Sequence, residues 1–417
     1  MDRFIIDGAK RLGGEIIVDT SKNASLPIIA ASILSSDKII LKSLPQIADV
    51  QKMLDILQSL GAKVEKWESD VCIDASFINS YEISEQLTKE IRSSIFMLGP
   101  MIAKLGKAKV AYPGGCKIGN RPIDLHLSGL RELGIDIKEE DGYICCDGSN
   151  FRGGVVNLSY PSVGATENLL MVGTLAENKT VKIINAAKEP EIVDLANFIN
   201  KMGGCVQGAG TGTIVVKGVR KLKGVEYKPI ADRIVTGTYL LAAAMTGGKI
   251  TLKHCDAEHV FSLIIKLRNS GCMITTKNDN ICIESYKRMS ACPSVSTQPY
   301  PGFPTDLQAP MMSMLTVADG ISVIKENLFE SRFKHVPELV KMGAKIQVRD
   351  SLAIIRGVEG LCGTNVVAED LRGGAALVLA GLCASGTTVV ENIKYIDRGY
   401  ENFEQKLSML GARIERK

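Results

Sequence analysis

The sequence predicts an α/β protein built from six copies of one structural unit. Blocks of similar pattern recur at intervals of roughly 70 residues, a spacing typical of internal repeats. They begin near Lys38, Lys107, Lys179, Lys249, Gly320 and Gly386. Each block opens with a short β-branched run, passes through a polar stretch into an amphipathic helix, and ends in alternating strands. The recurrence of this pattern in all six blocks predicts six α/β units of one design.

The amphipathic helices are predicted to end at glycine. The first ends in L-G-A at residues 60–62 and the last in L-G-A at residues 410–412, with L-G-I, M-G-G, N-S-G-C and M-G-A between them. Glycine is the residue expected just past a helix because it adopts a left-handed conformation without strain.

A second set of helices lies between consecutive blocks and differs from the first. These segments are apolar nearly all round and rich in Ala, Gly and Ser, at residues 25–34, 95–104, 166–176, 235–245, 309–318 and 373–382. A helix with no polar face is buried on every side. We therefore expect these six helices to form the interior of the protein, with the amphipathic helices and the sheets around them.

Charged residues mark the amino-terminal ends of the apolar helices. Five helices carry them (Lys22, Arg92, Asp232 with Arg233, Asp306, and Asp370 with Arg372), and the sixth begins at Ser162. Helix capping accounts for Asp232, Thr305, Asp306 and Asp370. It does not account for the cations, which oppose the positive end of the helix dipole. Either a substrate with several phosphates or carboxylates, or ion pairs with Asp and Glu, would offset them.

Composition excludes several classes of protein. The net charge of the 417 residues is only +4 and no long Lys/Arg tract is present, so nucleic acid is not an expected partner. The amino-terminal residues lack the apolar core of a signal peptide. The apolar run at residues 375–384 is far shorter than the ~20 residues needed to span a bilayer. A cytosolic protein without membrane insertion is expected.

Cysteine and histidine usage gives no indication of a metal site. The eleven cysteines are an odd number without a C-x-x-C pair, which favours free thiols, and the four histidines have no ligand spacing. One cysteine stands apart. Cys116 follows two glycines in the segment from Tyr112 to His126, with cations at Lys117 and Arg121. Nearby positive charge lowers the pKa of a thiol, so the segment is either a loop with a reactive cysteine or a glycine turn that contains one.

Three weaker motifs have ordinary interpretations. The segment G-A-G-T-G-T at residues 208–213 lies between two strand-like runs and predicts a hairpin turn rather than a phosphate loop. Glu189 and Glu191 fit helix-start carboxylates, although they could form an acid and base pair. Arg398 fits a surface cation.

Taken together, several segments resemble the UDP-N-acetylglucosamine enolpyruvyl transferases, the MurA family of bacterial peptidoglycan synthesis. In chain order these are S-K-N-A-S-L-P, P-G-G-C-K-I-G-N-R-P-I-D-L-H, P-S-V-G-A-T-E-N, E-P-E-I-V-D, D-R-I, F-P-T-D-L-Q-A, E-D-L-R and Y-I-D-R-G-Y-E, which span residues 21 to 401. The cysteine loop is the most specific. The sister family that makes 5-enolpyruvylshikimate 3-phosphate shares the sixfold design but lacks this loop.

The resemblance implies a two-lobed inside-out α/β barrel. The catalytic lobe would comprise residues 1–21 and 230–417, and the lobe that carries the Cys116 lid loop would comprise residues 22–229. Substrates would bind in the cleft between the lobes. The implied reaction transfers the enolpyruvyl group of phosphoenolpyruvate to the 3′-hydroxyl of UDP-N-acetylglucosamine, with release of phosphate and without a cofactor or metal.

The resemblance also implies roles for individual residues. Cys116 would be the general acid and Asp306 the base, while Lys22, Arg121 and Arg398 would hold the phosphate and carboxylate of phosphoenolpyruvate. Further substrate contacts would come from Asn23, Arg92, Pro122, Ile123, Asp124, Leu125, Ser162, Val163, Gly164, Glu189, Arg233, Leu328, Arg332, Asp370 and Arg372.

The sequence departs from the usual family pattern at a few positions, among them Tyr160, Val235 and Ser331. Two other functions are compatible with the same residues. One is a thiol hydrolase that uses His126 as its base. The other is a non-catalytic paralogue that binds a nucleotide sugar or acts as a regulator.

Overall fold

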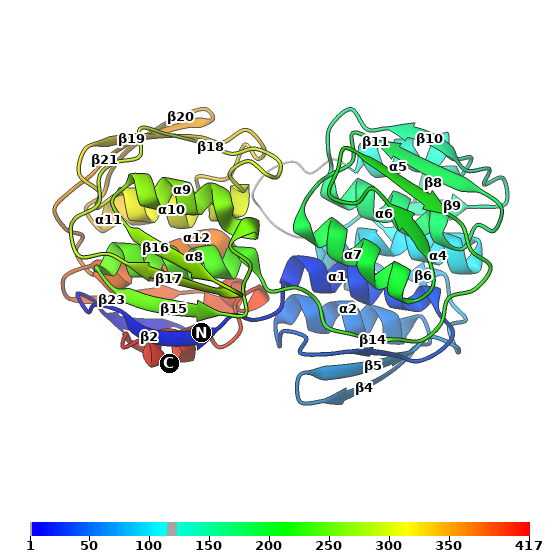
Figure 1. Cartoon of the computed structure of the whole chain (residues 1–417), viewed down its shortest axis with the longest axis horizontal. Helices are drawn as coiled ribbons and strands as arrows, with labels where there is room; N and C mark the ends of the chain where they lie inside the picture. Colours follow the sequence, from blue (N-terminus) through cyan, green and yellow to red (C-terminus); the bar gives the residue numbers. More distant parts are fainter. Residues whose placement is uncertain (1, 115–122) are drawn as a thin grey trace. The chain divides into compact units, whose positions relative to one another are not determined.

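The computed structural model describes residues 2–114 and 123–417, and it has the α/β repeat architecture that the sequence predicts (Figure 1). Six four-stranded sheets are present in the described part of the chain, and all share one topology. In each sheet the first strand pairs in parallel with the second. The second pairs antiparallel with the third, and the third pairs antiparallel with the fourth. The six sheets are the six predicted repeats.

The chain divides into two compact units. The terminal unit contains residues 2–19 and 231–417, and the middle unit contains residues 20–114 and 123–230. Each has its own hydrophobic core. The two segments that connect the units lie side by side, because the N–H of Ser21 donates to the carbonyl of Ile230 at 2.7 Å and the N–H of Asp232 donates to the carbonyl of Asp19 at 2.8 Å.

The middle unit contains three of the sheets. In order across each sheet, they are β14 (Glu226–Tyr227), β3 (Ile39–Leu41), β5 (Asp70–Asp74) and β4 (Lys63–Trp67); β6 (Glu82–Ile83), β7 (Lys107–Ala111), β9 (Tyr143–Asp147) and β8 (Asp136–Glu140); and β10 (Gly154–Asn157), β11 (Thr180–Ile184), β13 (Thr213–Lys217) and β12 (Cys205–Gln207). The segment at residues 208–213 joins β12 to its antiparallel partner β13, which confirms the predicted hairpin turn.

The terminal unit contains the other three sheets. They are β22 (Asn365–Val367), β23 (Thr387–Glu391), β1 (Phe4–Asp7) and β24 (Arg413–Arg416); β16 (Met273–Lys277), β17 (Asn280–Glu284), β15 (Lys249–Lys253) and β2 (Gly13–Ile17); and β18 (Ser294–Ser296), β19 (Ile321–Lys325), β21 (Leu352–Arg356) and β20 (Lys345–Arg349). The amino-terminal strand β1 pairs with β23 and β24, so both ends of the chain belong to one sheet.

The apolar helices are buried as predicted. The middle unit has α1 (Lys22–Ala31), α4 (Leu98–Leu105) and α6 (Val163–Thr174), and the terminal unit has α8 (Arg233–Thr246), α10 (Gln308–Leu315) and α12 (Leu371–Cys383). Thirteen of the fourteen residues of α8 are buried, and burial of each large aliphatic side chain contributes about 1.5–3 kcal/mol. In the terminal unit α8, α10 and α12 pack against one another.

Close packing of the buried helices requires small residues at their contacts. A Cβ added to Gly99 on α4 would lie 2.5 Å from the carbonyl oxygen of Asn168 on α6.

Two of the six apolar helices begin later than the others, after short 3₁₀ turns: η2 (Arg92–Met97) precedes α4, and η4 (Thr305–Leu307) precedes α10. Pro100 and Pro310 lie in the first turns of these α-helices, where a missing N–H costs no hydrogen bond.

The amphipathic helices complete the repeats. They are α2 (Ala48–Ser59), α5 (Asp124–Glu132), α7 (Pro190–Lys201), α9 (Phe261–Asn269), α11 (Val336–Lys341) and α13 (Phe403–Met409). Each is followed by a glycine with positive φ, from 89° at Gly134 to 103° at Gly61, as the sequence predicts. The remaining short helices are η1 (Ser32–Leu34), α3 (Glu85–Glu90), η3 (Glu258–Val260) and η5 (Ile393–Arg398).

None of the helices in the described ranges is long and apolar enough to cross a membrane. In the same ranges no three His, Cys, Asp or Glu side chains are grouped as metal ligands would be.

Candidate active site

Three of the predicted site residues, Cys116, Arg121 and Pro122, lie outside the described residues. Apart from Arg398, which ends η5, the others fall at the amino-terminal ends of helices or in the loops beside them.

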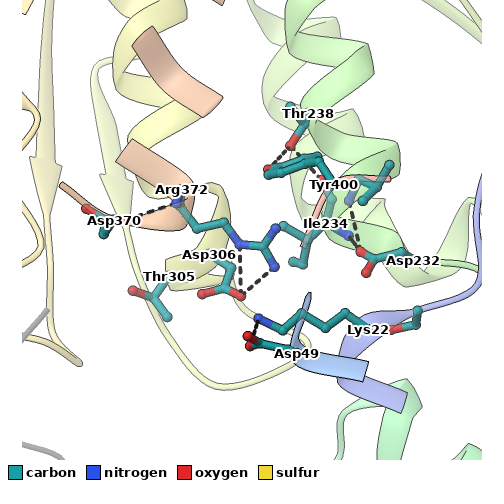
Figure 2. A network of polar contacts seen from close by, with 12 residues as sticks. Lys22, Asp49, Asp232, Ile234, Thr238, Thr305, Asp306, Asp370, Arg372 and Tyr400 are labelled. Carbon is teal, nitrogen blue, oxygen red and sulfur yellow. Dashed lines mark hydrogen bonds and ion pairs between the residues drawn. The ribbon is translucent and has the colours of Figure 1, made fainter. Parts of the chain in front are cut away.

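In the terminal unit, Asp306 is the centre of a charged network. It lies in η4, and its carboxylate accepts hydrogen bonds from two guanidinium groups, those of Arg332 (Nη2 to Oδ1, 2.5 Å) and Arg372 (Nη2 to Oδ2, 3.0 Å). Figure 2 shows Arg372 reaching Asp306 from the start of α12. Both arginine side chains are 3% exposed, whereas the Asp306 side chain is 24% exposed. The carboxylate is therefore the accessible end of a buried network.

The same network includes a tyrosine that sequence reasoning missed. The guanidinium of Arg372 lies 5.3 Å from the ring centroid of Tyr400, and the Tyr400 hydroxyl is 2.9 Å from the Thr238 hydroxyl on α8. Burial raises the pKa of Tyr400, so the hydroxyl stays neutral and can donate to Thr238. Tyr400 follows Arg398 by two residues at the end of η5, and its position in the quoted Y-I-D-R-G-Y segment was the available signal.

The capping prediction is right for two acids and wrong for two other residues. Asp232 caps α8 by accepting from the N–H groups of Ile234 and Val235, and Asp370 caps α12 by accepting from Arg372 and Gly373. Thr305 and Asp306 do not cap α10. The helix begins only after η4, and the Asp306 carboxylate is occupied by the two arginines.

A buried glutamate holds Thr305 and the loop that contains Leu328. One oxygen of Glu326 accepts from the Thr297 hydroxyl at 2.9 Å and from the N–H of Leu328 at 2.9 Å, and the other accepts from the Thr305 hydroxyl at 3.0 Å. Glu326 is 3% exposed. It links the predicted substrate contact at Leu328 to the residue that precedes Asp306, and sequence reasoning gave it no role.

Two further predicted site residues of the terminal unit are Arg233 and Arg398. Arg233 is the first residue of α8, and its guanidinium lies 5.6 Å from the ring centroid of Tyr300. Arg398 is the last residue of η5 and is partly exposed.

In the middle unit, Lys22 is the first residue of α1 and is buried. Its Nζ lies 2.7 Å from a carboxylate oxygen of Asp49 on α2, with side-chain exposures of 11% and 7% (Figure 2). An acid on a neighbouring helix therefore offsets a cation that opposes the helix dipole, as one of the two predicted alternatives requires. Asn23 follows Lys22 on α1.

Ser162 and Gly164 begin α6, as the motif predicts. The Ser162 hydroxyl caps the helix by accepting from the N–H of Ala165. Gly164 leaves room for His126, because an added Cβ would lie 2.8 Å from Cε1 of that ring. Val163 lies between them, while Ile123, Asp124 and Leu125 begin α5.

His126 is a buried neutral imidazole and not a promising base. Burial and the nearby cation of Arg92 lower its pKa to about 3. The amide of Asn168 donates to its Nδ1 at 2.8 Å, because the amide oxygen already accepts from the N–H of Gly99. Asn168 thus supplies the orienting partner that sequence reasoning did not find. The low basicity argues against the thiol hydrolase.

Two glutamates at the start of α7 act on a buried glutamate of α6. Glu189 is the N-cap residue and Glu191 lies in the first turn, which confirms the interpretation as helix-start carboxylates. Both act electrostatically on Glu167 of α6, which is 1% exposed. Burial, with the charges of Glu191 and Glu189, raises the pKa of Glu167 well above its ordinary value.

Comparison with known proteins gives a consistent result. The EPSP synthase (3-phosphoshikimate 1-carboxyvinyltransferase) family matches residues 6–407. A UDP-N-acetylglucosamine 1-carboxyvinyltransferase 2 from Caldanaerobacter subterraneus subsp. tengcongensis is 51% identical over 416 residues, which cover 100% of both chains. A UDP-N-acetylglucosamine 1-carboxyvinyltransferase from Thermotoga petrophila is 47% identical, covering 100% of this chain and 99% of its own.

Solved structures share the fold at lower identity. The enolpyruvyl transferase NikO from Streptomyces tendae superimposes with a TM-score of 0.88 at 22% identity, covering 100% of this chain and 99% of its own. EPSP synthase from Acinetobacter baumannii gives a TM-score of 0.78 at 18% identity, with 100% coverage of both.

Proposed function

Because this chain belongs to the EPSP synthase family and to the UDP-N-acetylglucosamine 1-carboxyvinyltransferases, we propose that it catalyses the transfer for which those relatives are named. It moves the enolpyruvyl group of phosphoenolpyruvate to the 3′-hydroxyl of UDP-N-acetylglucosamine and releases phosphate, a step of peptidoglycan synthesis in the cytoplasm. The observation that carries the proposal is the full-length match to the Caldanaerobacter transferase.

The reaction needs three proton transfers, two in the addition step and one in the elimination step. In the addition step the 3′-oxygen bonds to C2 of phosphoenolpyruvate, its proton leaves to a base, and an acid protonates C3. In the elimination step a base takes a proton from C3, the carbon–carbon double bond forms again, and the C2–O bond breaks with its electron pair leaving on phosphate. No oxidant, reductant or metal enters this balance.

We assign the base to Asp306 in the terminal unit. Its carboxylate is exposed on one side and is held by Arg332 and Arg372 on the other. Fixed donors orient a base, and general bases contribute about 10²–10⁴-fold to rate. Arg233, Asp370 and Leu328 contribute substrate contacts in this assignment, and Arg398 holds phosphoenolpyruvate. The terminal unit is thus proposed as the catalytic lobe.

The middle unit supplies Lys22 for the phosphate or carboxylate of phosphoenolpyruvate. Its ion pair with Asp49 offsets part of the cost of burying the ammonium. We assign the helix start at Ser162, together with Arg92, to binding of the nucleotide sugar. The N–H groups at a helix start, and cations, favour a diphosphate. Asn23, Glu189 and the residues from Pro122 to Leu125 complete this assignment.

Cys116 and Arg121 keep the roles that the resemblance implies, the general acid and a phosphoenolpyruvate contact. Replacement of Cys116 by Ala should abolish turnover and prevent alkylation by an epoxide reagent of the fosfomycin type. Labelling of the variant at the rate of the wild type would show that the reactive thiol lies elsewhere.

The decisive experiment measures phosphate released from phosphoenolpyruvate with two different acceptors. UDP-N-acetylglucosamine should support turnover, and shikimate 3-phosphate should not. Turnover only with shikimate 3-phosphate would reassign the substrate within the family. If both proposed substrates bind in calorimetry but no phosphate appears, the protein is the non-catalytic paralogue instead.

A further inference from the structure

The outer face of the sheet β18-β19-β21-β20 in the terminal unit has an unusual charge. Residues that alternate along these strands point away from the core, and four of them are cations. They are Lys325 on β19, Arg356 on β21, and Lys345 and Arg349 on β20. No acidic residue occupies an outward position on the four strands. We call these four cations, with the aliphatic side chains between them, the basic sheet face (strands in Figure 1).

The strand register places two of these cations directly opposite each other. Lys345 pairs with Arg356 across β20 and β21, and like charges in such a pair are destabilising. Among the paired positions of the described strands, this is the one pair of two cations. Neither side chain forms an ion pair with any described residue. An anion that is not part of the described chain would relieve this repulsion.

The other five repeats act as an internal comparison because they share the topology. In four of their sheets the outward residues mix charges, and several oppositely charged neighbours form ion pairs. Examples are Lys109 with Glu82 at 3.0 Å and Lys249 with Glu284 at 3.0 Å. The sheet β10-β11-β13-β12 carries two lysines, Lys182 and Lys217, that do not face each other. Four cations without an acid are thus particular to one repeat.

Exposed aliphatic side chains lie beside the cations. Ile321, Leu352 and Ile354 are 49%, 42% and 43% exposed. Leu352 is paired with Lys325 on one side and with Arg349 on the other, and Ile354 is paired with Val323. A face with apolar side chains at its centre and charges around them resembles the core and rim of a protein–protein interface.

Protection of a sheet edge explains only part of this pattern. Lysine and arginine on an edge strand discourage pairing with other chains, and β20 is an edge strand with Lys345 and Arg349. Lys325 and Arg356 lie on the central strands β19 and β21, where no edge needs protection. Edge protection also gives no reason for the exposed aliphatic side chains.

We propose that the basic sheet face is a docking surface for an acidic amphipathic segment of a partner protein. Lys345 lies opposite Arg356, and Lys325 lies opposite Leu352. Along the strands these two pairs are four residues apart, which is about 13 Å. A segment with carboxylates at both ends of such a span, and with aliphatic residues between them, matches the face in charge and polarity. A lipid surface fits less well, because the outward residues include no Trp or Tyr.

The test uses the full-length protein and a fluorescein-labelled peptide with the repeat Glu-Ala-Leu-Glu, followed by fluorescence anisotropy. The double variant Lys345→Glu and Arg356→Glu should weaken binding at least tenfold. The matched control, Lys182→Glu with Lys217→Glu in the middle unit, should bind as the wild type does. Affinity should also fall between 50 and 300 mM salt, since surface ion pairs are screened.

Two results would overturn the proposal. One is equal binding of the peptide by the wild type and the Lys345/Arg356 variant, or no binding by either, with both folded by circular dichroism. The other is sedimentation of the wild type with phosphatidylglycerol vesicles while it ignores the peptide, which would make the face a lipid-binding surface. Because the face contains no residue of the proposed active site, turnover of both double variants should equal that of the wild type.

Discussion

Asp306 binds two buried guanidinium groups and is itself partly accessible. The ion pairs are its structural role, and acceptance of a proton is its proposed chemical role. The arginines are held by their own surroundings: Arg372 stacks near Tyr400, and Arg332 also donates to the carbonyl of Thr305 at 3.2 Å. Substitution of the acid therefore removes a proton acceptor from a network that is otherwise fixed.

Asp306→Asn should remove the base, and its amide oxygen can accept from only one of the two arginines, Arg332 or Arg372, that the carboxylate binds. We expect kcat to fall about 10²–10⁴-fold, because an amide does not accept a proton, with a smaller change in the affinity for UDP-N-acetylglucosamine. Steady-state kinetics and calorimetry measure the two quantities. The exposed residue Glu359 in the same unit gives the control, Glu359→Gln. A loss confined to substrate affinity would contradict the assignment of a base.

Glu167 gives a prediction about pH and stability. Burial and two neighbouring glutamates raise its pKa in the folded protein above the unfolded value of 4.5. Above pH 4.5 the unfolded chain loses this proton while the folded chain keeps it, so this group makes the protein less stable as pH rises. Its contribution is least unfavourable below pH 4.5.

Glu167→Gln should remove this dependence, because glutamine is the neutral analogue of the protonated acid. We expect the Tm of the variant to exceed that of the wild type by a few degrees at pH 8 and to approach it at pH 5, measured by scanning calorimetry. The exposed Glu177→Gln should leave the difference at zero at both pH values. A gap that widens toward acid pH would show the opposite sign and refute the account.

At the scale of elements, Glu326 shows how a strand end organises a loop. It follows β19, and it accepts hydrogen bonds from Thr297, Thr305 and the backbone of Leu328. A buried donor that loses its partner costs about 1–3 kcal/mol. Removal of one carboxylate therefore affects both the segment before Asp306 and the loop at Leu328.

Glu326→Ala should raise KM for the nucleotide sugar and lower kcat together, because Leu328 is a proposed substrate contact and Thr305 adjoins the base. Its Tm should fall as well. Restoration of acceptor capacity in Glu326→Gln should recover part of both losses, while an effect on Tm alone would show that the glutamate is only structural. The exposed control is Glu359→Ala.

Local sequence predicted the helices and strands better than the side-chain contacts between them. Glycine termini and apolar helices are local signals, so the six units could be predicted. The ion pair of Lys22 with Asp49 could not, because Asp49 looks like any acid in the first turn of an amphipathic helix. The error at Asp306 has a similar cause: a Thr-Asp pair before a helix reads as a cap, whereas the arginines that bind the acid come from distant segments.

The whole molecule consists of two units whose hydrophobic cores share no residue. The terminal unit can form only when the two ends of the chain meet, because β1 pairs with β23 and β24. Local sequence signals carry no information about pairing across this distance, and the resemblance to a known family supplied that expectation.

Separate cores predict separate responses to core mutations. Leu379 on α12 and Leu195 on α7 are both 0% exposed, and replacement of either by Ala should cost about 2–5 kcal/mol. Leu379→Ala should speed hydrogen exchange in the strands of the terminal unit and spare β11 and β13. Leu195→Ala should do the reverse, so each variant serves as the control for the other. Mass spectrometry of peptic fragments resolves the two units. Equal loss of protection in both units from either change would mean that they unfold as one cooperative body, and the two cores could then no longer be treated as independent sources of stability.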